Sequence, residues 1–274
     1  MKIWLDGALQ DAESARVSVF DHGLTVGDGV FETIKADHGR AFALTRHLER
    51  LGTSARGLGL PEPDLDEVRR GCAAVLDAHP MPLGRLRITY TGGVSPLGSD
   101  RGEAGPTLVI ALSATERRPD TTAAVTVPWT RNERGALAGL KTTSYGENVV
   151  ALARAREHGA SEALFANTVG ALCEGTGSNV FVVLDGELHT PPLHSGCLAG
   201  ITRALTVSWA GAKETDLPLD ALERAEEIFL TSTLRDVQAV TRIDGRQLAD
   251  GPGPVTAEAM RIFDRQSAAD FDPR

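Results

Sequence analysis

Hydrophobic residues recur along the first part of the chain at two different spacings. Apolar positions three and four residues apart predict helices at Leu44–Leu58 and Leu65–Ala78. Short apolar runs near glycine and proline predict strands at Ile3–Leu5, Ala8–Gln10, Arg85–Thr91 and Thr107–Ala114, and a glycine-rich turn that continues as a strand over Val26–Ile34. Because the first two strands flank Asp6-Gly7, they predict a hairpin.

The polar stretch Arg117–Thr122, which contains Pro119, interrupts this pattern and is the predicted linker. Beyond it the pattern predicts helices at Tyr145–Glu157 and Gly200–Ala210, and strands at Ala124–Val127, Glu162–Ala166, Asn179–Val183, Leu188–Thr190 and Glu227–Thr231. We therefore predict a small N-terminal lobe over residues 1–116, a linker at 117–122 and a larger lobe over 123–274.

Composition narrows the possible functions. A net charge of −9 over 274 residues leaves no basic excess for non-specific nucleic-acid binding. The three cysteines have no metal-type spacing and are an odd number, so we expect neither a metal site nor a disulfide framework. No apolar run is long enough to span a membrane, and the N-terminus lacks a signal-peptide pattern. We expect a cytoplasmic protein.

Lys141 and Glu174 are the first candidates for chemistry. Lys141 is one of four lysines in a chain that otherwise carries its positive charge on arginine. A lysine with a lowered pKa can form a Schiff base with an aldehyde cofactor, whereas arginine stays protonated. An acidic residue such as Glu174 can keep the ring nitrogen of pyridoxal phosphate protonated. Taken singly, the two residues also fit a solvated lysine and a turn.

The order of several motifs resembles the class IV aminotransferase family of pyridoxal phosphate enzymes. The matching motifs are Gly27-Asp28-Gly29-Val30-Phe31-Glu32-Thr33, Lys141, Glu174-Gly175-Thr176-Gly177-Ser178-Asn179-Val180-Phe181, Gly200-Ile201-Thr202-Arg203 and Thr231-Ser232-Thr233. The resemblance implies an α/β (α+β) fold of two lobes, in which the larger C-terminal lobe contains a pseudo-barrel sheet. It also implies pyridoxal 5′-phosphate as the cofactor.

Physical arguments accompany the implied cofactor contacts. Ile201 and Thr202 would begin a helix, where free backbone N–H groups and the helix dipole favour a phosphate. Arg50 matches the family's phosphate-binding arginine, and a guanidinium forms two hydrogen bonds to phosphate oxygens. The resemblance adds Thr233 as a hydroxyl donor to the phosphate. Tyr145 is a candidate for the cofactor's phenolic oxygen or the substrate, with simple helix packing as the alternative.

The predicted substrate contacts depart from one family pattern. Many D-amino-acid aminotransferases bind the substrate carboxylate with an Arg-x-His pair and a tyrosine. Here Leu97 and Ser99 occupy the positions of that pair, and Phe31 replaces the tyrosine. Arg87 and Arg235 are therefore candidates for the carboxylate, with Arg101 as a third.

These residues leave several functions open. The preferred prediction is an aminotransferase that uses Lys141 as the catalytic residue and moves an amino group from a D-amino acid or (R)-amine to a 2-oxo acid. An aminodeoxychorismate lyase, which forms 4-aminobenzoate and pyruvate, fits the same motifs. A branched-chain aminotransferase is a second alternative. A non-catalytic binding protein is disfavoured because it has no need for Lys141 with Glu174. The resemblance further implies a homodimer with active sites near the subunit interface, and the Gly92–Gly102 loop is expected to cross it.

Overall fold

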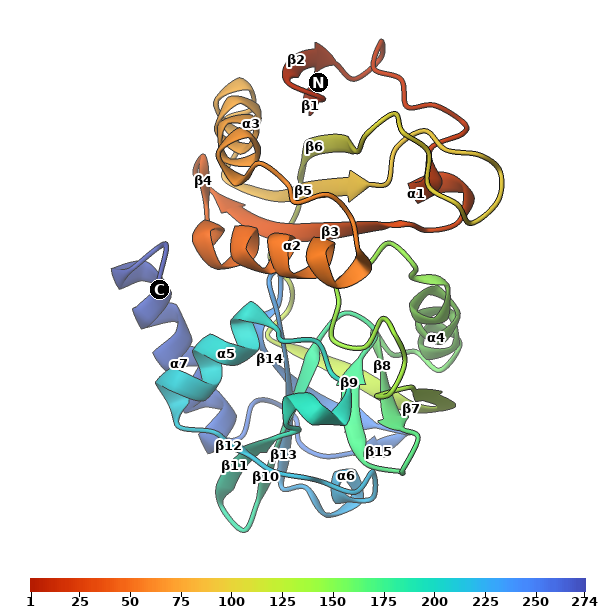
Figure 1. The fold of residues 1–274 in the computed structure, drawn as a ribbon. Helices are drawn as coiled ribbons and strands as arrows, with labels where there is room; N and C mark the ends of the chain where they lie inside the picture. The colour runs from red at the N-terminus through yellow and green to blue at the C-terminus, as the bar shows by residue number, and fades with distance from the viewer. The chain divides into compact units, whose positions relative to one another are not determined.

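The computed structural model describes residues 1–274 and divides into two compact units (Figure 1). The first unit comprises Met1–Arg117, Leu140–Ser144 and Phe271–Arg274, and the second comprises Arg118–Gly139 and Tyr145–Asp270. The division differs from the predicted boundaries in two places, because the short segments Leu140–Ser144 and Phe271–Arg274 belong to the first unit. Phe271 joins it through its carbonyl, which accepts from Ala43 N–H at 2.9 Å, and through an edge-on ring contact with Phe42.

The first unit contains a six-stranded antiparallel sheet in the order β2-β1-β6-β5-β3-β4. Its strands are β1 (Lys2–Leu5), β2 (Ala8–Asp11), β3 (Gly29–Asp37), β4 (Arg40–Ala41), β5 (Leu83–Thr91) and β6 (Thr107–Ala114). Its helices are α1 (His22–Thr25), α2 (Leu44–Leu58) and α3 (Leu65–Ala78). The predicted hairpin and both long helices are confirmed.

Successive side chains of β3 and β5 point to opposite faces of the sheet, so the two faces carry different residues. Val30, Ile34 and Ala36 of β3, with Leu86 and Ile88 of β5, lie in the buried core together with α2 and α3. The alternate residues Phe31, Thr33, Arg87 and Thr89 point to the other side of the sheet. On that side Phe31 pairs with Thr89, and Thr33 pairs with Arg87, in the strand register. Two of the predicted substrate residues, Phe31 and Arg87, therefore depend on these two central strands.

The second unit contains a nine-stranded mixed sheet, in which β7 runs parallel to both β8 and β14. Its strands are β7 (Thr121–Arg131), β8 (Glu162–Asn167), β9 (Leu172–Gly175), β10 (Asn179–Leu184), β11 (Glu187–Thr190), β12 (Lys213–Glu214), β13 (Glu227–Ser232), β14 (Asp236–Ile243) and β15 (Arg246–Gln247). The helices are α4 (Gly146–Glu157), η1 (Leu193–Ser195), α5 (Ile201–Ala210), α6 (Ala221–Arg224) and α7 (Pro254–Ala269). None of the helices is long and apolar enough to cross a membrane.

The sequence pattern missed some elements of the second unit. β14 begins at Asp236, whose φ is +52°, directly after a three-residue turn that joins it to β13, so no long loop marks its start. α7 begins at Pro254, a residue suited to the first turn of a helix because its missing N–H needs no partner there. The predicted linker overlaps β7 by two residues, Thr121 and Thr122.

Candidate functional site

The segment that carries Lys141 is bound to β3 by its backbone. Phe31 N–H donates to the Lys141 carbonyl at 3.0 Å, and Thr143 N–H donates to the Gly29 carbonyl at 2.8 Å. On the other side, Lys141 N–H donates to the Ser54 hydroxyl of α2 at 3.1 Å. These three bonds fix the Lys141 backbone between a central strand and a helix.

The side chains of Lys141 and Arg87 both contact the ring of Phe31. The Lys141 Nζ atom lies 4.4 Å from the ring centroid, and the Arg87 Cζ atom lies 3.4 Å from it. Cations over an aromatic face are attracted by its negative potential. Arg87 also donates to the hydroxyls of Thr89 at 3.3 Å and Thr33 at 3.4 Å. Phe31 thus brings the amine of Lys141 and the guanidinium of Arg87 to one aromatic ring.

Arg50 of α2 is held by the buried carboxylate of Glu32. Its Nε and Nη2 atoms donate to the two Glu32 oxygens at 2.8 and 2.7 Å. His47, one turn earlier on α2, places its Nδ1 atom 2.7 Å from the same carboxylate. Burial raises the pKa of Glu32, but the charge of Arg50 and the hydrogen bonds from Arg50 and His47 outweigh that effect and lower the pKa to about 2. Arg50 therefore has a fixed orientation.

Glu174, at the end of β9, has its carboxylate held from two directions in the second unit. Leu198 N–H donates to Glu174 Oε2 at 2.9 Å, and Arg131 Nε lies 3.3 Å from Oε1. Arg131 in turn lies over the Phe165 ring, with its Cζ 4.1 Å from the centroid, and donates to Asn148 at 3.0 Å. An oriented carboxylate beside a guanidinium suits a role as partner to a protonated ring nitrogen.

The start of α5 has the features of a phosphate site. Gly200 precedes the helix without a side-chain cap, so the N–H groups of Ile201 and Thr202 begin a helix that carries no capping side chain. A Cβ at Gly200 would lie 2.0 Å from Asn179 Oδ1, which requires glycine there. Thr231 supplies a buried hydroxyl that has no hydrogen-bond partner. Because Leu198 contacts Glu174 and lies two residues before Gly200, the acid and the helix start are linked by a short segment. These donors fit pyridoxal phosphate.

Other predicted residues have different surroundings. Arg235 is buried, and its guanidinium donates to Ser161 O at 3.0 Å and lies 3.4 Å from Glu162 Oε2. Burial lowers the pKa of Arg235, and the Glu162 carboxylate opposes that shift. These contacts favour a structural role for Arg235 over the predicted substrate contact. Leu97 lies in an exposed loop, Tyr145 immediately precedes α4, and Thr233 lies in the turn after β13.

A profile of the family described as amino-transferase class IV matches residues 29–243. The chain belongs to the class IV aminotransferase family. Among curated relatives of this aminotransferase, a putative branched-chain-amino-acid aminotransferase of Methanocaldococcus jannaschii is 36% identical over 96% of this chain and 95% of the relative. The D-alanine aminotransferase of Staphylococcus haemolyticus is 30% identical over 96% of this chain and 97% of its own.

Solved structures of other aminotransferases and of a putative lyase share the fold. The branched-chain aminotransferase of Thermoproteus uzoniensis with norvaline matches with a TM-score of 0.90 and 31% identity, over 97% of this chain and 94% of that one. A putative 4-amino-4-deoxychorismate lyase of Legionella pneumophila matches with a TM-score of 0.87 and 26% identity, over 93% and 97%. A PLP-bound hypothetical aminotransferase of Mycobacterium tuberculosis matches with a TM-score of 0.88 and 28% identity, over 98% and 100%. The aminotransferase described here is accordingly a PLP-dependent enzyme of class IV.

Sequence reasoning missed the residues that orient the predicted ones. Glu32 lies among buried apolar residues in the sequence, and a buried carboxylate needs a charged partner. His47 and Arg50, which occur one helical turn apart on α2, were the available partners. Arg131 had no comparable signal, because its contact with Glu174 joins residues that are distant in the sequence.

The Glu32 pair predicts an acid-dependent stability of the aminotransferase. The pKa of Glu32 in the folded protein lies below its usual value of 4.5. The ionised Glu32 carboxylate therefore stabilises the fold fully above pH 4.5, and this stabilisation is lost as the pH falls towards about 2. We expect Glu32→Gln to lower the free energy of unfolding by about 3 kcal/mol at neutral pH and much less near pH 3. Denaturant unfolding at both pH values measures the free energy of unfolding. Glu49→Gln, at an exposed position of α2, is the control. An equal loss of unfolding free energy at both pH values would contradict a lowered pKa of Glu32.

Proposed function

We propose that this enzyme transfers an amino group from a D-amino acid or an (R)-amine to a 2-oxo acid. The observation that carries the proposal is the shared contact of Lys141 and Arg87 with the Phe31 ring. An anionic group bound by Arg87 would contact the same aromatic ring as the amine that would handle the substrate proton. Such an arrangement suits a substrate whose carboxylate is next to its reacting carbon.

The residues divide the chemical work between them. When bound, pyridoxal phosphate supplies an aldehyde that condenses with amines and a ring that withdraws electrons. Lys141 Nζ would hold the cofactor through its aldehyde and, when free, would accept the proton from the donor's α-carbon. The Glu174 carboxylate, oriented by Leu198 N–H and Arg131, would keep the ring nitrogen protonated. Arg50 and the N–H groups of Ile201 and Thr202 would be the phosphate donors.

Two other substrate classes have specific support. The likeness to the Legionella structure, together with Leu97 and Ser99 at the positions of the Arg-x-His pair, favours an aminodeoxychorismate lyase. The M. jannaschii and T. uzoniensis relatives favour branched-chain amino acids as donors. All three activities use the same lysine, so the substrate contacts decide among them. A homodimer with active sites near the subunit interface remains part of the proposal.

A titration of the purified holoenzyme followed by absorption distinguishes these activities. The donors are D-alanine, (R)-1-phenylethylamine, L-leucine and aminodeoxychorismate. Conversion of the bound cofactor to its amine form by D-alanine or the (R)-amine supports the proposal. Conversion by L-leucine alone supports the branched-chain alternative. Release of pyruvate from aminodeoxychorismate without the amine form identifies the lyase and overturns the proposed transamination.

The position of Arg87 predicts a selective effect on carboxylate substrates. We expect Arg87→Ala to raise the KM for 2-oxo acids by about tenfold or more, because a charged hydrogen bond to the carboxylate is lost. The half-reaction with (R)-1-phenylethylamine, which has no carboxylate, should change little. Arg85→Ala, at the more exposed arginine of the same strand, serves as the control. Equal losses with both substrates would mean that Arg87 has a structural role.

A further inference from the structure

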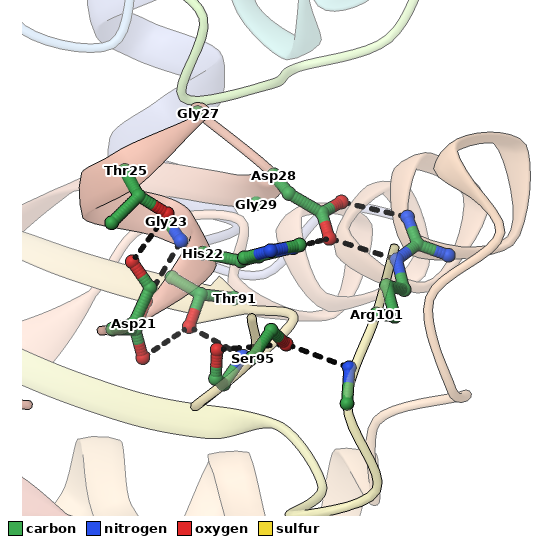
Figure 2. A network of polar contacts seen from close by, with 12 residues as sticks. Asp21, His22, Gly23, Thr25, Gly27, Asp28, Gly29, Thr91, Ser95 and Arg101 are labelled. Carbon is green, nitrogen blue, oxygen red and sulfur yellow. Dashed lines mark hydrogen bonds and ion pairs between the residues drawn. The ribbon is translucent and has the colours of Figure 1, made fainter. Parts of the chain in front are cut away.

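Asp28 lies at the centre of a polar network beside β3 (Figure 2). Its Oδ1 atom is 2.6 Å from Arg101 Nη2, and its Oδ2 atom accepts from Arg101 Nε at 2.8 Å. His22 is fully buried, and its Nδ1 atom lies 3.4 Å from Asp28 Oδ2. The hydrogen bond from Arg101 lowers the pKa of Asp28, so the carboxylate is charged at neutral pH.

The backbone around Asp28 is bound to the residues that follow Lys141. The Gly27 carbonyl accepts from the hydroxyls of Thr143 at 2.9 Å and Ser144 at 3.1 Å. The Gly29 carbonyl accepts from Thr143 N–H at 2.8 Å. Gly27 has a φ of +70°, which favours glycine in this turn. One side of the turn is thus fixed to the lysine segment.

The side chain of Asp28 faces the Gly92–Gly102 loop. Gly92 N–H donates to the Asp28 carbonyl at 2.9 Å, and a Cβ at Gly92 would lie 2.4 Å from Asp28 Oδ2. The carboxylate therefore lies directly against the start of the loop. His22 Nε2 donates to the Pro96 carbonyl within the loop at 3.0 Å. The loop tip beyond it is exposed, with Leu97 at 73% of its full accessibility.

Further hydrogen bonds close the base of the loop. Thr91 Oγ1 donates to Asp21 Oδ2 at 3.0 Å and accepts from Gly93 N–H at 3.2 Å. Gly102 N–H donates to Ser95 Oγ at 2.9 Å (Figure 2). The base is accordingly held without the Asp28 side chain, and Arg101 links the far end of the loop to the turn.

Arg101 connects the same loop to α2. Besides Asp28, it donates to the carbonyls of Leu58, at 2.8 Å, and Gly59. These carbonyls lie at the C-terminal end of α2, where a cation is favoured by the helix dipole. The guanidinium is therefore bound by a carboxylate and by backbone carbonyls, which argues against Arg101 as the substrate-carboxylate residue. Its geometry instead suits a fixed link between the loop, the turn and the helix that carries Arg50 and Ser54.

We propose that Asp28 is a positioning residue that, through Arg101 and His22, holds the Gly92–Gly102 loop against the Lys141 segment and so sets the substrate fit of the loop tip. The part that concerns substrate fit rests on the proposed aminotransferase function. The part that concerns the loop depends only on the contacts described above. Asp28 itself takes no part in the chemistry.

Limited trypsin digestion tests the link to the loop. Arg101-Gly102 is a trypsin site whose arginine side chain is bound by Asp28. We expect Asp28→Asn to increase the initial rate of cleavage at this bond by about tenfold, since a charged hydrogen-bonded pair is lost. Asp77→Asn, at an exposed position of α3 outside the cleaved sequence, makes the same change in charge and should leave the rate near that of the wild type. Peptide mass analysis identifies the bond that is cut. An unchanged rate in Asp28→Asn overturns the proposal.

Kinetics with the holoenzyme tests the consequence for substrate. We expect Asp28→Asn to raise the KM for the 2-oxo acid by about tenfold, with kcat and the melting temperature close to the wild type, because the lysine segment keeps its own backbone bonds. Arg101→Lys, which keeps the charge but loses the paired hydrogen bonds, should give an intermediate KM. A parallel fall in kcat and melting temperature would mean a general structural role and overturn the proposal. If the wild type does not transaminate, the proposed function fails, while the trypsin result still decides the loop contact.

Discussion

The backbone pairing of Leu140–Ser144 with β3 is the constraint on which the first half of the site depends. The bonds between Phe31 and Lys141 and between Thr143 and Gly29 add a short extra strand segment to the sheet. Backbone pairing fixes the register, and the register decides which side chains face one another. As a result the Lys141 amine lies over the Phe31 ring, which Arg87 also contacts.

Four arginine–carboxylate pairs fix the orientation of side chains around the candidate site residues. Glu32 binds Arg50, Asp28 binds Arg101, Glu174 contacts Arg131, and Glu162 contacts Arg235. A buried charge is costly unless it is paired, so each pair restricts both partners to one geometry. Arg101 and Arg235 are each paired with a carboxylate, and Arg87 contacts the Phe31 ring that Lys141 also contacts.

The sequence predicted much of this enzyme because its signals are local. The spacing of apolar residues placed α2, α3 and five of the six strands of the first unit, all except β4, and the ordered motifs identified the family. The short segment that carries Lys141 could not be assigned to the first unit, because its partners on β3 lie more than a hundred residues earlier in the chain. The partners of Glu174 and Asp28 were missed because they belong to other elements of the chain. Ion pairs between distant residues leave no spacing pattern, and strand register is not visible in one sequence.

The central claim is that Lys141 is the residue that bonds to the cofactor. Borohydride reduction of the holoenzyme, followed by proteolysis and peptide mass analysis, tests it most directly. The account predicts a pyridoxyl group on Lys141 and on no other lysine, and Lys141→Ala should carry no covalent label after the same treatment. A pyridoxyl group on Lys2, Lys35 or Lys213 in the wild type, with Lys141 unmodified, would contradict the account.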